Sequence, residues 1–170
     1  MAPPYDADPA PVWICVDPGI VGTGYAVFNQ LDLTPTHFGV LVAKGNGAEW
    51  MERVRGIATQ FSQILKRHKP GQVILEFQEL YPGATSMTSG FRGDLFKLSL
   101  ATGAMCCVSW EYTGQTPILK RPREWKGQLP KDIVELRVKK HYEKAGLAFP
   151  HIPNHAMDAV GMGFAQRGLL

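Results

Sequence analysis

The chain has 170 residues, of which 45% are hydrophobic, so it is long enough to form one domain with a substantial core. It contains no apolar stretch of the length that a membrane-spanning helix needs, and residues 1–11 lack the basic and apolar regions of a secretory signal. The net charge is only +3, and the three cysteines lie in apolar runs, which favours free thiols in a reducing cytoplasm over disulfides or a zinc site. We expect a disordered proline-rich tail over 1–11 and a single domain over 12–170.

The first half of the chain predicts a three-stranded meander, a long helix and a further strand. The meander strands are expected over 12–16, 22–29 and 37–44. Their short connections favour antiparallel pairing. Apolar residues then recur at helical spacing over about 48–68, and Pro70-Gly71 ends that helix. The next strand, over 72–77, is apolar like the first, and both runs predict strands that are buried on two faces.

The second half predicts a long loop, three helices and a short strand. Residues 79–93 lack periodicity, and loops of this length are more often functional than idle. Helices are expected over about 94–108, 131–144 and 155–166, with a strand over 116–119. The positions expected to face the core are Val134, Val138, Tyr142, Met157, Val160 and Phe164. Asn154 is the expected cap of the last helix, which places Asp158 in its first turn, where the helix dipole favours a carboxylate.

Positive charge is concentrated in the third quarter of the chain. Residues 11–51 contain one lysine or arginine, whereas residues 119–144 contain nine. Arg137, Lys140 and Lys144 share one face of their predicted helix. Such a concentration is typical of a surface that binds a polyanion, although on charge alone a solvated face explains it equally well.

Three acidic residues stand out by their context. Asp17 ends the first buried strand just before a Pro-Gly turn, Glu76 lies near the end of another, and Asp158 opens the last helix. Each has an ordinary explanation by itself, as a turn residue, a strand end or a helix N-terminal charge. Together, carboxylates from two adjacent strands and a packing helix can bind Mg²⁺, and two such ions can support phosphodiester cleavage.

The order and spacing of these segments resemble Holliday-junction resolvases of the RuvC type, within the RNase H-like nuclease superfamily. The matching segments are Asp17-Pro18-Gly19 with 22–27, Ile74-Leu75-Glu76, Lys97-Leu98 with Gly103, the basic loop 122–127, and 155–159. The resemblance covers about residues 12–167. It implies an α/β, RNase H-like fold with a five-stranded mixed sheet, in which an antiparallel three-strand meander is joined to parallel strands and flanked by helices.

The resemblance also implies an activity and a cofactor. The activity is that of a crossover junction endodeoxyribonuclease, which hydrolyses phosphodiester bonds with two Mg²⁺ ions per site, and Mn²⁺ is expected to substitute. The implied catalytic and metal-binding residues are Asp17, Glu76, His155 and Asp158. His155 stands where many members of the family carry aspartate. It suits Mn²⁺ better than Mg²⁺, could instead transfer a proton, or could be a helix-start histidine without a role. Glu79 is expected to be exposed or to lie behind the ligands.

The same resemblance implies a homodimer that binds a four-way DNA junction and nicks two symmetrically placed strands. Phosphate contacts are expected from Arg92, Lys97, Lys120, Arg123, Lys126 and Lys131, and these would make binding strongly salt-dependent. An aromatic side chain near the crossover is expected from Tyr81, Phe91 or Phe77, and of these we expect Phe77 to lie in the core. Partners in recombination or phage replication stay open.

There are three alternatives to a junction resolvase. The nearest is a phage-type flap, fork, branched-DNA or packaging nuclease on the same fold. An actin-like ATP-binding domain also carries Asp-x-Gly in its first hairpin, but that architecture needs two such domains and a second phosphate loop, which 170 residues do not supply. A non-catalytic junction-binding protein would not need the three acids.

Overall fold

A computed structural model describes residues 12–43, 49–78 and 93–170. The expected tail over 1–11 lies outside the described residues, as do four residues singled out in the long loop: Glu79, Tyr81, Phe91 and Arg92. Within the described ranges, no helix combines the length and the apolarity needed to cross a membrane.

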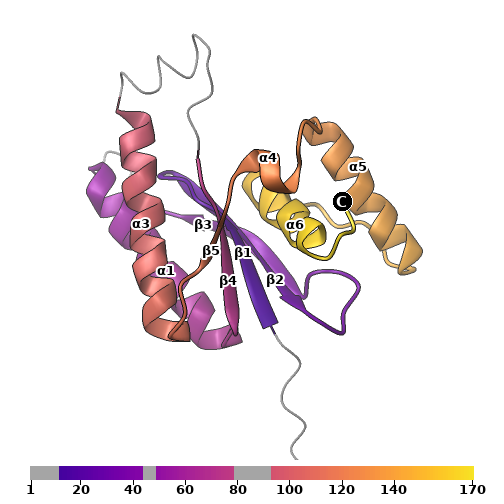
Figure 1. Ribbon diagram of the computed structural model, residues 1–170, viewed down its shortest axis with the longest axis horizontal. Helices are drawn as coiled ribbons and strands as arrows, with labels where there is room; N and C mark the ends of the chain where they lie inside the picture. Colours follow the sequence, from indigo (N-terminus) through magenta and orange to yellow (C-terminus); the bar gives the residue numbers. More distant parts are fainter. Residues whose placement is uncertain (1–11, 44–48, 79–92) are drawn as a thin grey trace, which may run out of the picture.

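A five-stranded mixed sheet runs through the middle of the molecule in the order β3-β2-β1-β4-β5 (Figure 1). The strands are β1 (Val12–Asp17), β2 (Gly22–Asn29), β3 (His37–Val42), β4 (Gln72–Glu76) and β5 (Ile118–Lys120). The first three form an antiparallel meander, while β4 pairs in parallel with both β1 and β5. This arrangement confirms the fold that the resemblance implies.

Helices cover both faces of the sheet (Figure 1). They are α1 (Trp50–His68), α3 (Asp94–Thr113), α4 (Pro122–Trp125), α5 (Lys131–Lys144) and α6 (Asn154–Gln166). Helices α1 and α3 pack together on one face of the sheet, and α4, α5 and α6 lie on the other face. In β1, Ile14 and Val16 join the core under α1 and α3, whereas Cys15 joins the core under α6. This alternation explains why the strand is continuously apolar, because both of its faces are buried.

Several predicted boundaries are wrong for local reasons. Helix α3 continues to Thr113 instead of ending near 108, because the first residue that stops it is Gly114, which caps it with a left-handed φ of 67°. Strand β3 ends at Val42, and β5 spans Ile118–Lys120 instead of 116–119. The four-residue turn α4, where Arg121 and Glu124 form a capping box, is too short to produce a periodic pattern.

Two predictions about single residues are also corrected. Pro153, and not Asn154, is the N-cap of α6, so Asp158 lies in the second turn and not in the first. Phe77 is 40% exposed instead of buried, because it follows the last residue of β4. Of the three free cysteines only Cys15 is buried, whereas Cys107 is exposed on α3. The predicted core positions of α5 and α6 are confirmed.

Candidate active site

The two strand-end acids lie side by side on the α6 face of the sheet. Strands β1 and β4 are parallel neighbours with Val16 opposite Leu75, so Asp17 and Glu76 end adjacent strands at the same edge. Alternation along each strand directs both carboxylates to the face that carries Cys15, which is covered by α6. Asp17 and Glu76 are only 8% and 6% exposed. Their side chains are therefore held in place by the sheet and largely removed from water.

The side chain of Thr23 holds the turn after Asp17 through two hydrogen bonds. The Thr23 hydroxyl accepts a hydrogen bond from the Gly19 N–H at 3.1 Å and donates one to the Gly19 carbonyl at 2.9 Å. Gly24 lies opposite Asp17 in the β1–β2 pair. A Cβ at Gly24 would overlap the backbone of His155, so the glycine is what lets the start of α6 lie directly on the hairpin.

Helix α6 brings the third acid and the histidine to the same place. His155 Nδ1 lies 3.4 Å from Asp17 Oδ2. Three residues further along the helix, Asp158 Oδ2 accepts a hydrogen bond from Lys131 Nζ at 2.7 Å. The same ammonium group donates to the Asn154 carbonyl at 3.1 Å, which ties the start of α5 to the start of α6.

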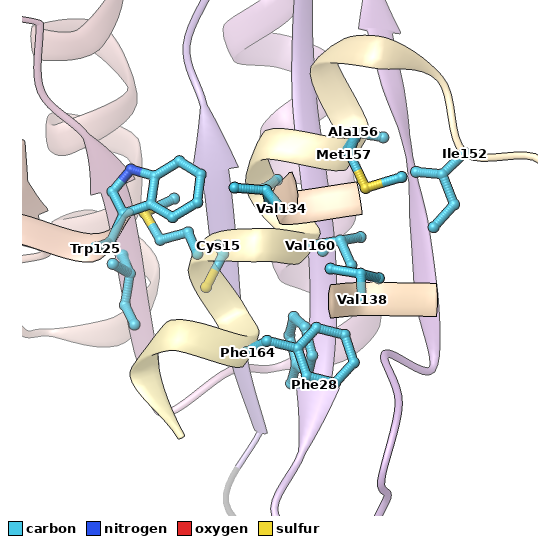
Figure 2. Packing of buried hydrophobic residues seen from close by; sticks show 14 of the residues in the cluster. Cys15, Phe28, Trp125, Val134, Val138, Ile152, Ala156, Met157, Val160 and Phe164 are labelled. Carbon is cyan, nitrogen blue, oxygen red and sulfur yellow. The ribbon is translucent and has the colours of Figure 1, made fainter. Parts of the chain in front are cut away.

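Both carboxylate oxygens of Glu76 have partners. The indole Nε1 of Trp125 donates to Oε2 at 2.8 Å in a buried contact, and the Gln78 amide donates to Oε1 at 3.0 Å. Trp125 lies within the basic segment 119–144, yet it is only 6% exposed and lies in the core beside Val134 (Figure 2). Sequence patterns missed this contact, because nothing in the local pattern around Trp125 indicates which way the ring turns.

The charges at this edge of the sheet interact strongly. The pKa of Asp17 is raised to about 8, first by burial and then by the negative charges of Glu76 and Asp158, against the opposing effect of Lys131 and Lys126. Burial also raises the pKa of Glu76, against the Trp125 hydrogen bond, which lowers it. The site thus concentrates more negative charge than its own cations offset, which favours the binding of an added cation.

An open cleft of about 690 Å³ leads to these groups. Asp17, His155, Asp158 and Lys131 line it, together with the turn 18–22. Gln78, Asp94, Leu98 and Asn154 complete its wall, so the start of α3 borders the cleft as well. Its walls come from both halves of the chain, which only the folded sheet brings together.

The carboxylates of Asp17, Glu76 and Asp158 offer hard oxygen donors of the kind that Mg²⁺ and Mn²⁺ bind. In this structure, however, no three His, Cys, Asp or Glu side chains of the described residues are gathered closely enough to hold a metal ion. The contacts above explain this, since Asp158 is turned toward Lys131 and Glu76 toward Trp125 and Gln78. A cation bound at Asp158 Oδ2 would compete with the Lys131 ammonium.

The predicted phosphate-binding residues do not all lie at the cleft. Lys131 lines it, and Lys126 is close enough to lower the pKa of Asp17. Lys120 is beside Glu76 in the sheet register but bonds Gln166, and Lys97 pairs with Asp94 at 3.7 Å. Arg123 is exposed on α4. The stripe Arg137, Lys140 and Lys144 is exposed along α5, as predicted.

No family model matches the chain. A curated relative, the crossover junction endodeoxyribonuclease RuvC of Chlamydia muridarum, is 32% identical over 130 residues, which cover 74% of this chain and 73% of the relative. The structure of Thermus thermophilus RuvC in complex with a Holliday junction substrate superposes with a TM-score of 0.72 and 25% identity, covering 92% of both chains.

A more distant likeness extends only to the fold. The yeast mitochondrial Holliday junction resolvase Ydc2 superposes with a TM-score of 0.58 and 11% identity, covering 93% of this chain and 80% of that one. The identity to the bacterial relative extends over about three quarters of both chains. This chain therefore belongs to the RuvC family of crossover junction endodeoxyribonucleases.

Proposed function

We propose that the protein is a Mg²⁺-dependent endonuclease that resolves four-way DNA junctions by paired, symmetric nicks. The observation that carries the proposal is that Glu76 and Asp158 both lie close enough to Asp17 to raise its pKa, and that Asp17 and Asp158 line the same cleft. The bacterial relative is named as an enzyme of this activity, and T. thermophilus RuvC is described in complex with a Holliday junction substrate.

Asp17, Glu76 and Asp158 are the proposed metal-binding residues, with His155 as a fourth candidate. Two bound ions would lower the pKa of the attacking water and stabilise the leaving oxygen. Asp17 lies between the other groups, since both remaining acids and His155 act on it, so we assign it to both ions. Mn²⁺ suits a site that includes an imidazole and is expected to substitute for Mg²⁺.

His155 is suited to move a proton at the cleft. Its side chain is 57% exposed, and its Nδ1 faces the Asp17 carboxylate, which orients the ring. An exposed imidazole beside a carboxylate can accept a proton from water or give one to a leaving oxygen. We propose this role beside that of a metal ligand, because both need the same placement at the start of α6.

The cations around the cleft are proposed to bind the DNA backbone. Lys131 is already at the site and is released from Asp158 if a divalent cation replaces it there, which leaves its ammonium free for a phosphate. Lys126 and Arg123 on the neighbouring turn, and the stripe on α5, extend positive charge away from the cleft. A junction has twofold symmetry, so we propose a homodimer in which each protomer cuts one strand.

A cleavage panel tests the proposal. The wild-type protein is incubated with a four-way junction, a flap, a fork and a linear duplex, each with Mg²⁺, Mn²⁺ or EDTA. We expect paired nicks in the junction with either metal, little cutting of the duplex, and no cutting in EDTA. Faster cutting of flaps than of junctions would instead favour the flap-nuclease alternative, and equal cutting of plain duplex contradicts resolvase activity.

The Asp17→Asn variant separates catalysis from binding. We expect it to bind the junction with near wild-type affinity in a gel-shift assay, and to lose at least about a hundredfold in cleavage rate, because it removes a ligand and a charge from the metal site. Asp32→Asn, at an exposed aspartate, is the matched control and should cut normally. Cutting by Asp17→Asn at the wild-type rate would show that the assignment is wrong.

A further inference from the structure

Trp125 is placed to act on Glu76 although it lies in the segment expected to bind DNA. Its Nε1 donates to Glu76 Oε2 at 2.8 Å, and neither residue is more than 6% exposed. The contact spans 49 residues of sequence and joins the turn α4 to the end of strand β4. An indole N–H has a single donor and no acceptor, so its direction fixes which side of the carboxylate stays available.

The ring is held by packing from three directions. Val134 of α5 and the helix α6 border it in the core (Figure 2). A Cβ at Gly161 would lie 3.0 Å from the Trp125 ring and 2.8 Å from Val134, so this glycine leaves the space that the indole occupies. Lys126 Nζ lies 4.8 Å from the ring centroid on the outer side. With so little freedom, the N–H stays directed at Glu76.

The hydrogen bond limits how the carboxylate can turn. Because packing fixes the donor, the Glu76 oxygen that accepts from the indole keeps one direction. Among the described residues, each Glu76 oxygen accepts one hydrogen bond, from Trp125 or Gln78, and a carboxylate oxygen has a second lone pair for another partner.

We infer that Trp125 is a positioning residue for catalysis: its indole N–H holds Glu76 in the orientation in which the carboxylate binds a divalent cation. The inference rests on the proposed function, in which Glu76 is a metal ligand. Groups that orient a ligand in this way typically contribute 10- to 100-fold to metal affinity or activity. The capped turn α4 thereby connects the basic segment, which carries Lys126, to the acidic site.

The variant Trp125→Phe removes the N–H and keeps an aromatic ring. We expect its affinity for Mn²⁺, measured by calorimetry without DNA, to fall about 10- to 100-fold. Trp110→Phe makes the same change at an indole that is 63% exposed on α3, and should bind Mn²⁺ like the wild type. Wild-type Mn²⁺ affinity in a folded Trp125→Phe protein overturns the inference.

A second measurement keeps the test decisive if Trp125→Phe does not fold. In wild-type protein labelled with ¹⁵N-tryptophan, the four indole N–H signals report on the four tryptophans. We expect the Trp125 signal to shift when Mg²⁺ is added and to broaden strongly with paramagnetic Mn²⁺, while the Trp110 signal changes little. A Trp125 signal that neither ion affects overturns the inference.

The two proposals fail in different ways. Wild-type protein that binds Mn²⁺ at the Trp125 indole but does not cut junctions contradicts the proposed function and leaves the positioning role intact. Wild-type protein that cuts junctions, while Trp125→Phe has unchanged metal affinity and cleavage rate, contradicts the positioning role alone.

Discussion

Lys131 is the residue at which the proposed metal site and the proposed DNA-binding surface meet. Its ammonium is bonded to Asp158 and to the Asn154 carbonyl, so it partly neutralises the acidic site in this structure. A divalent cation at Asp158 would have to displace it, and a phosphate would then be a suitable new partner. The sequence indicated a phosphate contact at Lys131, but its pairing with a predicted metal ligand depends on α5 and α6 lying together.

The variant Lys131→Met should therefore change two affinities in opposite directions. We expect Mn²⁺ affinity without DNA to rise about two- to fivefold, because the lost ion pair is partly exposed and such pairs contribute up to about 1 kcal/mol. Junction affinity should fall in a gel-shift assay. Lys139→Met, exposed on the same helix, should change neither much. A drop in Mn²⁺ affinity in Lys131→Met would show that the lysine supports metal binding instead of competing with it.

At the scale of elements, the site depends on how closely α6 approaches the first hairpin. Gly24 permits this approach, because any side chain there would overlap the backbone of His155. The hairpin carries Asp17 opposite Gly24, and α6 carries His155 and Asp158. The glycine-rich strand after the first acid thus has a packing role: it sets the distance between groups that come from opposite ends of the chain.

Gly24→Ala is expected to lower both stability and cleavage. Overpacking of this kind typically costs about 1–3 kcal/mol in the free energy of unfolding, which urea denaturation measures. The shift of α6 should reduce cleavage further, by about a hundredfold for a displacement near 1 Å, at temperatures where the variant is folded. Gly56→Ala in α1 meets nothing within 4 Å and should stabilise by about 0.5–1 kcal/mol with normal cleavage. Equal stability and equal cleavage rates in Gly24→Ala and Gly56→Ala would contradict the packing role of Gly24.

For the whole molecule, the acidic site makes stability depend on pH. The pKa of Asp17 is raised from an ordinary 3.8 to about 8 by burial and by the neighbouring acids. Between those two values the folded state binds more protons than the unfolded state, so the free energy of unfolding falls as pH rises through this range. Above about pH 8 Asp17 is ionised in both the folded and the unfolded state, so its destabilising effect no longer changes with pH. His68 acts in the opposite sense, because burial and nearby His37 lower its pKa.

Comparing variants isolates the contribution of Asp17. We expect urea denaturation in EDTA to show Asp17→Asn more stable than wild type at pH 8, by an amount on the order of a few kcal/mol, with the difference shrinking toward pH 4. Adding Mg²⁺ at pH 8 should stabilise the wild type and not the variant. A difference between the two proteins that does not change with pH would contradict the burial of a charged Asp17.

The sequence by itself determined the sheet, the helices and the candidate acids. Unbroken apolar runs predicted strands buried on both faces, and Asp17 and Glu76 could be recognised because each interrupts such a run at its end. Local patterns were less informative at boundaries, where Gly114 and Pro153 set the ends of helices that periodicity alone placed elsewhere.

Only the tertiary structure decided which groups touch. Trp125 bonds Glu76 across 49 residues, and Lys131 bonds Asp158 across 27, and neither pair has a local signal because each depends on how α4, α5 and α6 pack on the sheet. The difference is physical: periodicity records which side of an element is buried, whereas a hydrogen bond between distant elements depends on their relative position to within about an ångström. The sequence therefore shows which acidic residues are candidates for the site, and packing determines what each of them contacts.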